Sequence, residues 1–261
     1  MKNKNINLLW MLLFNFCVVQ AQTNTNINFN RVGALHFPIS TIDSINYTVN
    51  SVVCPTTVSD VDGNIYNVIA IGDQCWTKEN LRTTHYMNGG IILNNLTNAQ
   101  WASALSGACA DYNNNAALTT IYGKLYNWYA VTDPGSLCPI GWHVSTNSDW
   151  SKLAYFLDPL SDTLDNANLV SRVVAADLRE AGTVHWLSSN TATNITGFTA
   201  LPGGVRFNSS GTYDGLNFYS YYWTSTPGGN GAINYLFENR SVLYRTSGSL
   251  KLGCPVRCVK D

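Results

Sequence analysis

The chain has 261 residues, of which 45% are hydrophobic and only 12% are charged, and its formal net charge at pH 7 is -1. The charged fraction is about half that of a typical globular protein, whereas the apolar fraction suffices for a packed core. A chain this close to neutral lacks the basic surface that binds nucleic acid, so no nucleic-acid partner is expected. The sequence contains no recognisable catalytic constellation, and no cofactor is expected.

The first residues have the order of a secretory signal peptide. Lys2 and Lys4 give a positive start, residues 8–19 are mostly apolar, and the run ends at the small residue Ala21. This order predicts a signal peptide over residues 1–21 that is cleaved on export. The apolar run is too short to span a bilayer and no later stretch is long enough, so no transmembrane segment is expected.

A lipid anchor is the alternative at this end of the chain. Cys17 is the candidate, but the residue before it, Phe16, is large where that processing needs a small residue. The sequence therefore predicts a secreted or cell-surface protein without a lipid anchor.

Composition divides the rest of the chain into two parts. Residues 22–53 are predicted to form a polar N-terminal leader, because residues 23–28 are polar and low in complexity. Weak alternation within residues 32–53 can add one strand. Residues 54–261 contain recurrent aromatic residues and turn signals without a linker, which indicates one domain.

Six cysteines follow the predicted cleavage site: Cys54, Cys75, Cys109, Cys138, Cys254 and Cys258. An even number in an exported protein indicates disulfide bonds, and six cysteines allow 15 complete pairings. Zinc is the alternative, but no C-x-x-C pair occurs and the four histidines are scattered, so no metal site is expected.

A β-hairpin is predicted around Gly63, where Asp62-Gly63-Asn64 separates two β-forming runs. A calcium loop is the alternative, because Asp60 and Asp62 alternate. An EF-hand loop has its glycine at the sixth position and an acidic residue at the twelfth. Here Gly63 is fourth and Ile71 is twelfth, so the hairpin is favoured.

Two or three helices are predicted. Thr146 and Asp149 have the spacing of a capping box, and apolar residues with helical periodicity follow it to residue 157. A second helix is predicted over residues 170–181 and a third over residues 123–131. Strands are predicted over residues 218–225 and 241–245, which are rich in β-forming residues. One buried cluster is predicted to contain Trp142, Trp150, Phe198 and Leu201.

Seven motifs occur in a characteristic order along the domain. They are Asp62-Gly63-Asn64-x-Tyr66, Ile71-Gly72-x-Gln74-x-Trp76, Glu79-Asn80-Leu81, Tyr122-Gly123-x-Leu125-Tyr126-Asn127-Trp128-Tyr129-Ala130-Val131, Cys138-Pro139-x-Gly141-Trp142-His143-Val144, Gly197-Phe198-x-Ala200-Leu201-Pro202-Gly203-Gly204 and Val256-Arg257-Cys258-Val259. From about residue 60 to residue 261, the chain resembles the Fibrobacter succinogenes major paralogous domain, a family of exported bacterial modules.

The resemblance implies a fold. That family is similar to C-type-lectin-like domains, on the branch that includes formylglycine-generating enzyme. The expected fold class is therefore α+β: a C-type-lectin-like domain with a twisted antiparallel sheet and two or three helices, stabilised by disulfides. The last strand, near residues 256–260, is expected to return beside the first elements.

The resemblance also guides the cysteine pairing. Cys258 occupies the closing-strand position, where a structural disulfide is expected, and Cys138 is its predicted partner. Cys54 and Cys75 flank one hairpin and form a second candidate pair. Cys109 and Cys254 then remain as a third.

Catalysis and calcium-dependent sugar binding lack support in the sequence. The cysteines of Cys254-Pro255-Val256-Arg257-Cys258 are expected to be structural rather than reactive. His143 enters an apolar strand and is expected to be packed and hydrogen-bonded rather than a base. The Glu-Pro-Asn, Gln-Pro-Asp and Trp-Asn-Asp strings of calcium-dependent lectins are all absent.

A ligand surface is predicted on the C-terminal third, beside the glycine-rich turn at residues 227–231. Tyrosine, asparagine and arginine provide large contact areas with adaptable hydrogen bonds. The alternative is that these tyrosines pack in the sheet. The candidate residues are Tyr222, Asn234, Tyr235, Asn239, Arg240 and Tyr244.

The expected function is a noncatalytic binding or structural module, secreted or on the cell surface, with an unknown protein or glycan ligand outside the cytoplasm. The alternative is a calcium-independent carbohydrate-binding module. An enzyme like formylglycine-generating enzyme is the third possibility.

Overall fold

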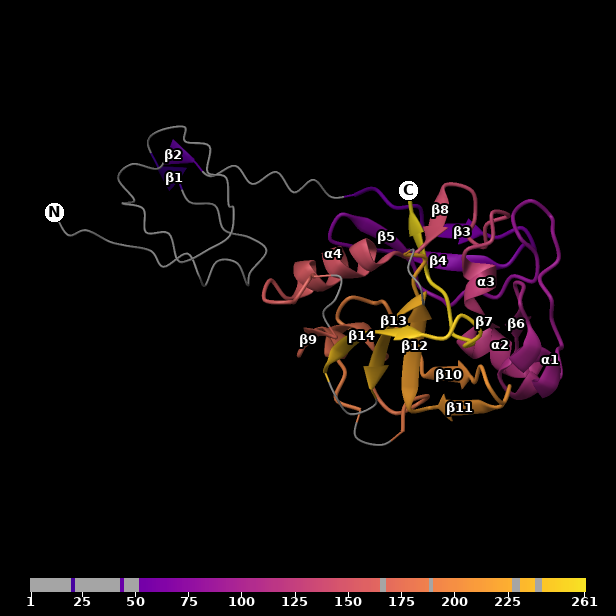
Figure 1. Cartoon of the computed structure of the whole chain (residues 1–261). Coiled ribbons are helices and arrows are strands. Elements are labelled where there is room, and N and C mark those ends of the chain that lie inside the picture. Colours follow the sequence, from indigo (N-terminus) through magenta and orange to yellow (C-terminus); the bar gives the residue numbers. More distant parts are fainter. Residues whose placement is uncertain are drawn as a thin grey trace. The chain divides into compact units, whose positions relative to one another are not determined.

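The computed structural model describes residues 52–164, 168–187, 190–226 and 241–261 with their side chains, and the backbone of 20–21, 43–44 and 231–237. The chain forms two units, residues 1–50 and 51–261 (Figure 1). In the first unit, β1 (Gln20–Ala21) pairs antiparallel with β2 (Asp43–Ser44). The remainder of the predicted signal peptide, and the leader up to residue 51 apart from β2, lie outside the described residues.

A five-stranded sheet joins the two ends of the second unit. Its order is β3 (Thr57–Ser59), β4 (Ile65–Ile71), β5 (Gln74–Thr77), β15 (Cys258–Lys260) and β8 (Trp142–Val144), and every pair is antiparallel. Val259 in the closing strand pairs with Trp76 on one side and His143 on the other. The expected return of the last strand beside the first elements is confirmed.

The β3–β4 hairpin is built on the Asp60 carboxylate. Its Oδ1 accepts hydrogen bonds from the amides of Asp62 at 3.0 Å and Asn64 at 2.9 Å, and its Oδ2 accepts one from the Tyr66 hydroxyl at 2.5 Å. Gly63 has φ +79°, which glycine adopts without strain. The predicted hairpin is confirmed, and Asp60, which the alternative calcium loop would have used, organises the turn. Among the described residues, no three histidine, cysteine or acidic side chains gather as a metal site.

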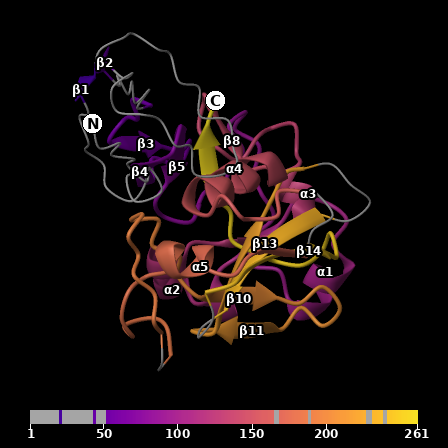
Figure 2. The same ribbon diagram turned by 90° about the vertical axis from the view of Figure 1, so that its left-hand side faces the viewer.

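A four-stranded antiparallel sheet comes mainly from the C-terminal third. Its order is β12 (Tyr219–Trp223), β13 (Gly231–Phe237), β14 (Leu243–Gly248) and β9 (Leu169–Ser171). Two short hairpins accompany it, β6 (Cys109–Ala110) with β7 (Leu125–Tyr126) and β10 (Gly203–Arg206) with β11 (Tyr213–Leu216). Figures 1 and 2 both place the five-stranded sheet at one end of this unit and the β10–β11 hairpin at the other.

The described residues contain five α-helices rather than two or three. They are α1 (Asn98–Ser103), α2 (Ala116–Tyr122), α3 (Trp128–Val131), α4 (Asn147–Leu157) and α5 (Val174–Leu178), with one 3₁₀ turn at Tyr112–Asn114. The helix predicted after Thr146 is confirmed as α4, with its capping box. None of the described helices has the length and apolar character needed to cross a membrane.

Two predicted helices are shorter than expected. Residues 169–171 form β9 because they pair with β14 across the sheet, so helix α5 starts only at Val174. Residues 125–126 form β7 because they pair with β6, and Asn127 caps a helix of four residues after it. In both places, a strand partner distant in sequence overrides the local apolar pattern.

The five-stranded sheet separates two core clusters. Successive strand residues point to opposite faces, so Cys75 and Cys258 enter the first cluster while Trp76 and Val259 enter the second. Trp142 packs in the first cluster, on the face of its strand neighbour Val144. Helix α4 brings Trp150 to the second.

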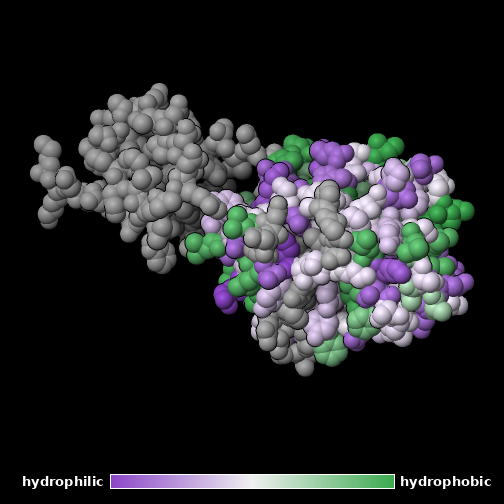
Figure 3. Space-filling model, viewed as in Figure 1, coloured by the Kyte–Doolittle hydropathy of each residue, from purple (hydrophilic) through white to green (hydrophobic). Residues whose placement is uncertain are grey.

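The predicted single aromatic cluster is therefore only partly correct. Trp150 and Phe198 lie together, with ring centroids 5.7 Å apart. Trp142 belongs to the opposite cluster, because β8 turns it to the other face of the sheet. Leu201 is half-buried. On the surface shown in Figure 3, hydrophilic and hydrophobic residues of the second unit are intermixed.

Candidate functional site

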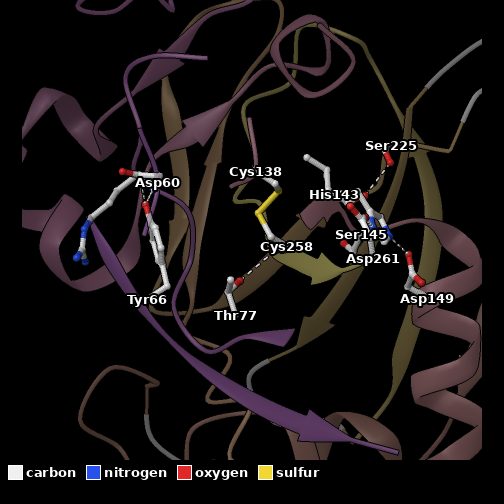
Figure 4. The surroundings of a disulfide bond; sticks show 12 residues. Asp60, Tyr66, Thr77, Cys138, His143, Ser145, Asp149, Ser225, Cys258 and Asp261 are labelled. Carbon is white, nitrogen blue, oxygen red and sulfur yellow. Dashed lines mark hydrogen bonds and ion pairs between the residues drawn. A yellow bond between two sulfur atoms is a disulfide. The ribbon is translucent and has the colours of Figure 1, made fainter. Parts of the chain in front are cut away.

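Two disulfides brace the five-stranded sheet. Cys138 and Cys258 are bonded with their Cα atoms 5.9 Å apart, which joins the chain before β8 to the closing strand (Figure 4). Cys54 and Cys75 are bonded with their Cα atoms 5.6 Å apart, which joins the chain before β3 to β5. Both pairs match the sequence-based expectation.

The third expected pair is wrong, since Cys109 and Cys254 are buried free thiols. Cys109 pairs with Tyr126 in the β6–β7 ladder, and Cys254 pairs with Tyr126 from the other side. Neighbouring strands are roughly 4.8 Å apart, so the two cysteine Cα atoms are separated by about 10 Å. That distance exceeds the reach of a disulfide, about 7 Å.

Neither thiol has a reactive environment. Burial raises the pKa of the Cys109 thiol to about 12, and burial also raises that of Cys254 well above its ordinary value. A nucleophilic cysteine needs an accessible, electropositive setting that stabilises the thiolate. These two side chains instead pack as small apolar groups in the first core cluster.

The predicted ligand surface requires a correction at Tyr222. Strand β12 alternates, and Ser220, Tyr222 and Thr224 are fully buried on one face. The Tyr222 ring packs 5.3 Å from Trp150 and 5.8 Å from Phe198, measured between ring centroids. Tyr222 is therefore a core residue, because its face of the sheet covers the second cluster.

On the opposite face of this sheet, Trp223 is buried in the first cluster, but the rings of Tyr219, Tyr221 and Tyr244 remain partly exposed. Together with Phe218, which just precedes β12, these rings are here called the aromatic row. Phe218 is 45% exposed, and Tyr219, Tyr221 and Tyr244 are half-buried. The Tyr219 ring lies 5.8 Å from Tyr221 and 6.3 Å from Phe218. Among the predicted site residues whose side chains are described, Tyr244 alone belongs to this row.

The backbone register places two further predicted residues. Tyr235 pairs with Tyr221 on one side and Tyr244 on the other, so it lies in the register of the aromatic row. Asn234 pairs with Tyr222 and Arg245, which are buried. The side chains of these two residues lie outside the described part of the chain, as do Asn239, Arg240 and residues 227–230.

His143 links three parts of the fold, and sequence reasoning did not find its partners. Its Nε2 lies 3.0 Å from Asp149 Oδ2, and its Nδ1 lies 2.6 Å from Asp261 Oδ1 (Figure 4). The bond with Asp149 raises the pKa of His143; burial opposes this rise, and the bond with Asp261 adds to it. Two neighbouring carboxylates favour the protonated imidazole, so His143 serves as a structural link between them.

Asp149 has a second role in this group. Its Oδ2 accepts hydrogen bonds from the amide of Thr146 at 2.8 Å and from the Thr146 hydroxyl at 2.6 Å. Burial raises the pKa of Asp149, but the bonds from His143 and Thr146 outweigh it and lower that pKa to about 2. The cap of α4 and the C-terminal residue are thus joined through one histidine.

These features define a mixed α/β domain with curled antiparallel sheets, two disulfides and an aromatic sheet face. The chain belongs to the Fibrobacter succinogenes major domain family, whose family model matches residues 69–260. No curated protein and no solved structure matches the chain significantly.

Proposed function

We propose that this chain is an exported, noncatalytic binding module, with a C-type-lectin-like fold on the branch of formylglycine-generating enzyme. Two features of the second unit support that fold. The closing strand β15 lies beside β5 in one sheet, and the C-terminal third forms a second antiparallel sheet. Export agrees with the two disulfides, because such bonds persist in oxidising compartments. The predicted signal peptide over residues 1–21 would direct it.

The aromatic row is the observation that carries the binding function. Rings that are half-buried in a sheet offer a large apolar area whose position is already fixed, so little entropy is lost on binding. Phe218 just precedes β12, Tyr219 begins that strand, and Tyr244 lies two strands away in β14. The ligand is an unidentified protein or glycan outside the cytoplasm.

The chemistry of the described residues supports binding over catalysis. The thiols that a formylglycine-generating-enzyme-like activity would use are in disulfides or buried. His143 is engaged at both ring nitrogens. A calcium-independent carbohydrate-binding module is the second candidate, because exposed aromatic rings also stack on the apolar faces of sugar rings.

A glycan array and a pull-down from the producing cell's envelope test this function, using residues 22–261. Phe218→Ala and Tyr244→Ala should each weaken ligand capture at least tenfold, the loss that about 1.4 kcal/mol represents. Phe156→Ala is the matched control, since Phe156 is 60% exposed on α4, outside the row. If both Phe218→Ala and Tyr244→Ala still capture the ligand as the unsubstituted protein does, the aromatic row is not the binding surface.

A further inference from the structure

A separate hollow of about 420 Å³ lies where α3 meets β8 and the end of β12. Three elements distant in sequence form it: α3 with the following loop at residues 132–137, strand β8, and the residues just after β12. Its volume is within the range of roughly 300–1,000 Å³ that small-ligand sites occupy. The lining that decides its chemistry is Trp128, Val131 and Leu137 on the apolar side, and Asp133, Ser136 and Ser225 on the polar side.

The loop that carries Asp133 is held in place by backbone hydrogen bonds. The amide of Ser136 donates to the Asp133 carbonyl at 3.0 Å, and the amide of Met87 donates to the Ser136 carbonyl at 2.9 Å. The Gly135 amide donates to Asp133 Oδ1 at 2.8 Å, which orients the carboxylate. Among the described residues, Oδ2 of Asp133 has no hydrogen-bond partner. A fixed acceptor therefore stands in the wall of the hollow.

The indole of Trp128 is also fixed. Its Nε1 donates to the Thr224 carbonyl at 3.1 Å, and its backbone amide donates to the Leu250 carbonyl at 2.8 Å. Ser225 donates its hydroxyl to the Val144 carbonyl at 2.8 Å, so its oxygen remains able to accept a further bond. The hollow combines a fixed aromatic ring with acceptors that need no rearrangement.

The charges around the hollow restrict its ligand. Asp133 carries one negative charge, and His143, which also lines the hollow, sits between the carboxylates of Asp149 and Asp261. The carboxylates of Asp149 and Asp261 offset any positive charge on His143, so the described lining of the hollow does not attract an anion. The lining offers serine hydroxyls, the Asp133 carboxylate and the Trp128 indole. This set suits a ligand that has several hydroxyl groups and one apolar face.

We propose that this hollow binds one neutral monosaccharide unit, with its C–H face against Trp128 and its hydroxyls bonded to Asp133 and Ser136. The inference goes beyond the binding function assigned to the aromatic row, because the row lies along β12 and β14 and contributes no residue to the hollow. The two sites can therefore be tested separately.

The experiment is a two-dimensional ¹H–¹⁵N NMR titration of residues 22–261 with free glucose, galactose, mannose or xylose. At least one sugar should give saturable shifts confined to the amides of residues 131–133, 135–137 and Ser225 and to the Trp128 indole. Asp133→Asn should weaken that sugar about tenfold or more, because hydrogen bonds to a charged group are the strong ones. The asparagine oxygen can still accept from Gly135, so this variant keeps the loop. Glucuronate should bind at least tenfold more weakly than glucose.

The controls separate the two sites. Phe218→Ala should leave the monosaccharide shifts unchanged, and Trp128→Leu should abolish them. If Trp128→Leu fails to fold, the sugar affinity of Asp133→Asn still tests the proposed site.

Absence of saturable shifts at tens of millimolar sugar would overturn the proposal, since a single sugar unit is expected to bind weakly but measurably. Tighter binding of choline than of any neutral sugar, or an unchanged affinity in Asp133→Asn, would also overturn it. If Phe218→Ala loses ligand capture without losing the sugar shifts, the two sites are independent.

Discussion

The guanidinium carbon of Arg257 lies 4.4 Å from the centre of the Phe198 ring, in the interior of the domain. Arg257 is only 1% exposed, and it donates to Asn80 Oδ1 at 2.6 Å and to the carbonyl of Thr77 at 2.8 Å. It also donates to the carbonyls of Phe198 and Thr199. One buried cation thus ties β5, the loop before β10 and the closing strand together, which explains the arginine in the Val-Arg-Cys-Val motif.

Replacing Arg257 should strongly destabilise the fold. Arg257→Met removes the charge but leaves an amide oxygen and several carbonyls without donors, and each such buried group costs about 1–3 kcal/mol. We expect a loss of about 3–5 kcal/mol in the free energy of unfolding, measured by denaturant titration. Arg257→Lys should recover only part of it, since an ammonium cannot reproduce the planar set of donors. A fully stable methionine variant would contradict this role.

The two disulfides should differ in their contribution to stability. Cys138 and Cys258 close a loop with a sequence separation of 120, whereas Cys54 and Cys75 are separated by 21. In the chain-entropy description, these loops correspond to about 5 and about 3 kcal/mol. Denaturant titration of the Cys138→Ala/Cys258→Ala and Cys54→Ala/Cys75→Ala variants would measure the difference. A larger loss from the shorter loop would show that another effect dominates.

The link between His143, Asp149 and Asp261 predicts how stability depends on pH. The folded-state pKa of His143 is raised, so its contribution is complete below about pH 6.5 and is lost as pH rises through the raised pKa. The pKa of Asp149 is lowered to about 2, so its contribution is present above about pH 4 and is lost as pH falls toward 2. The group should therefore stabilise the domain most between about pH 4 and pH 6.5.

Unfolding free energies measured from pH 4 to pH 9 test this dependence. The wild type should lose more stability above pH 6.5 than His143→Gln, because glutamine does not titrate. For Asp261→Asn, the loss of unfolding free energy with rising pH should be intermediate between those two, since this variant removes one of the two carboxylate partners of His143. Equal slopes for the wild type and His143→Gln would refute the role given to this histidine.

Local signals were sufficient where a few neighbouring residues determine the structure. The capping box fixed the start of α4, and the glycine in Asp62-Gly63-Asn64 marked the hairpin. Helices α1 and α2 went unrecognised because both are short and bury a single residue each, Trp101 and Tyr122. Their capping residues, Thr97 and Asn115, were the available signals.

Distant pairing explains what the sequence could not determine. Alternation along residues 219–223 puts Tyr221 and Tyr222 on opposite faces of the strand, but nothing in that alternation shows which face covers a core. Tyr222 was therefore assigned to the surface, although it packs on Trp150. The pairing of Cys109 with Cys254 failed for a similar reason, because only the fold places Tyr126 between them.

The unpaired state of Cys109 and Cys254 gives a direct chemical test of this arrangement. In native residues 22–261, neither thiol should react with an aromatic disulfide reagent, because both are buried and burial raises the pKa of each. After unfolding without reductant, two thiols per chain should react, and peptide mapping should place both labels on Cys109 and Cys254. Double substitution of these residues by Ala should abolish labelling while leaving both disulfides intact. Recovery of no thiols would mean that they are bonded to one another, which requires moving the Tyr126 strand from between them.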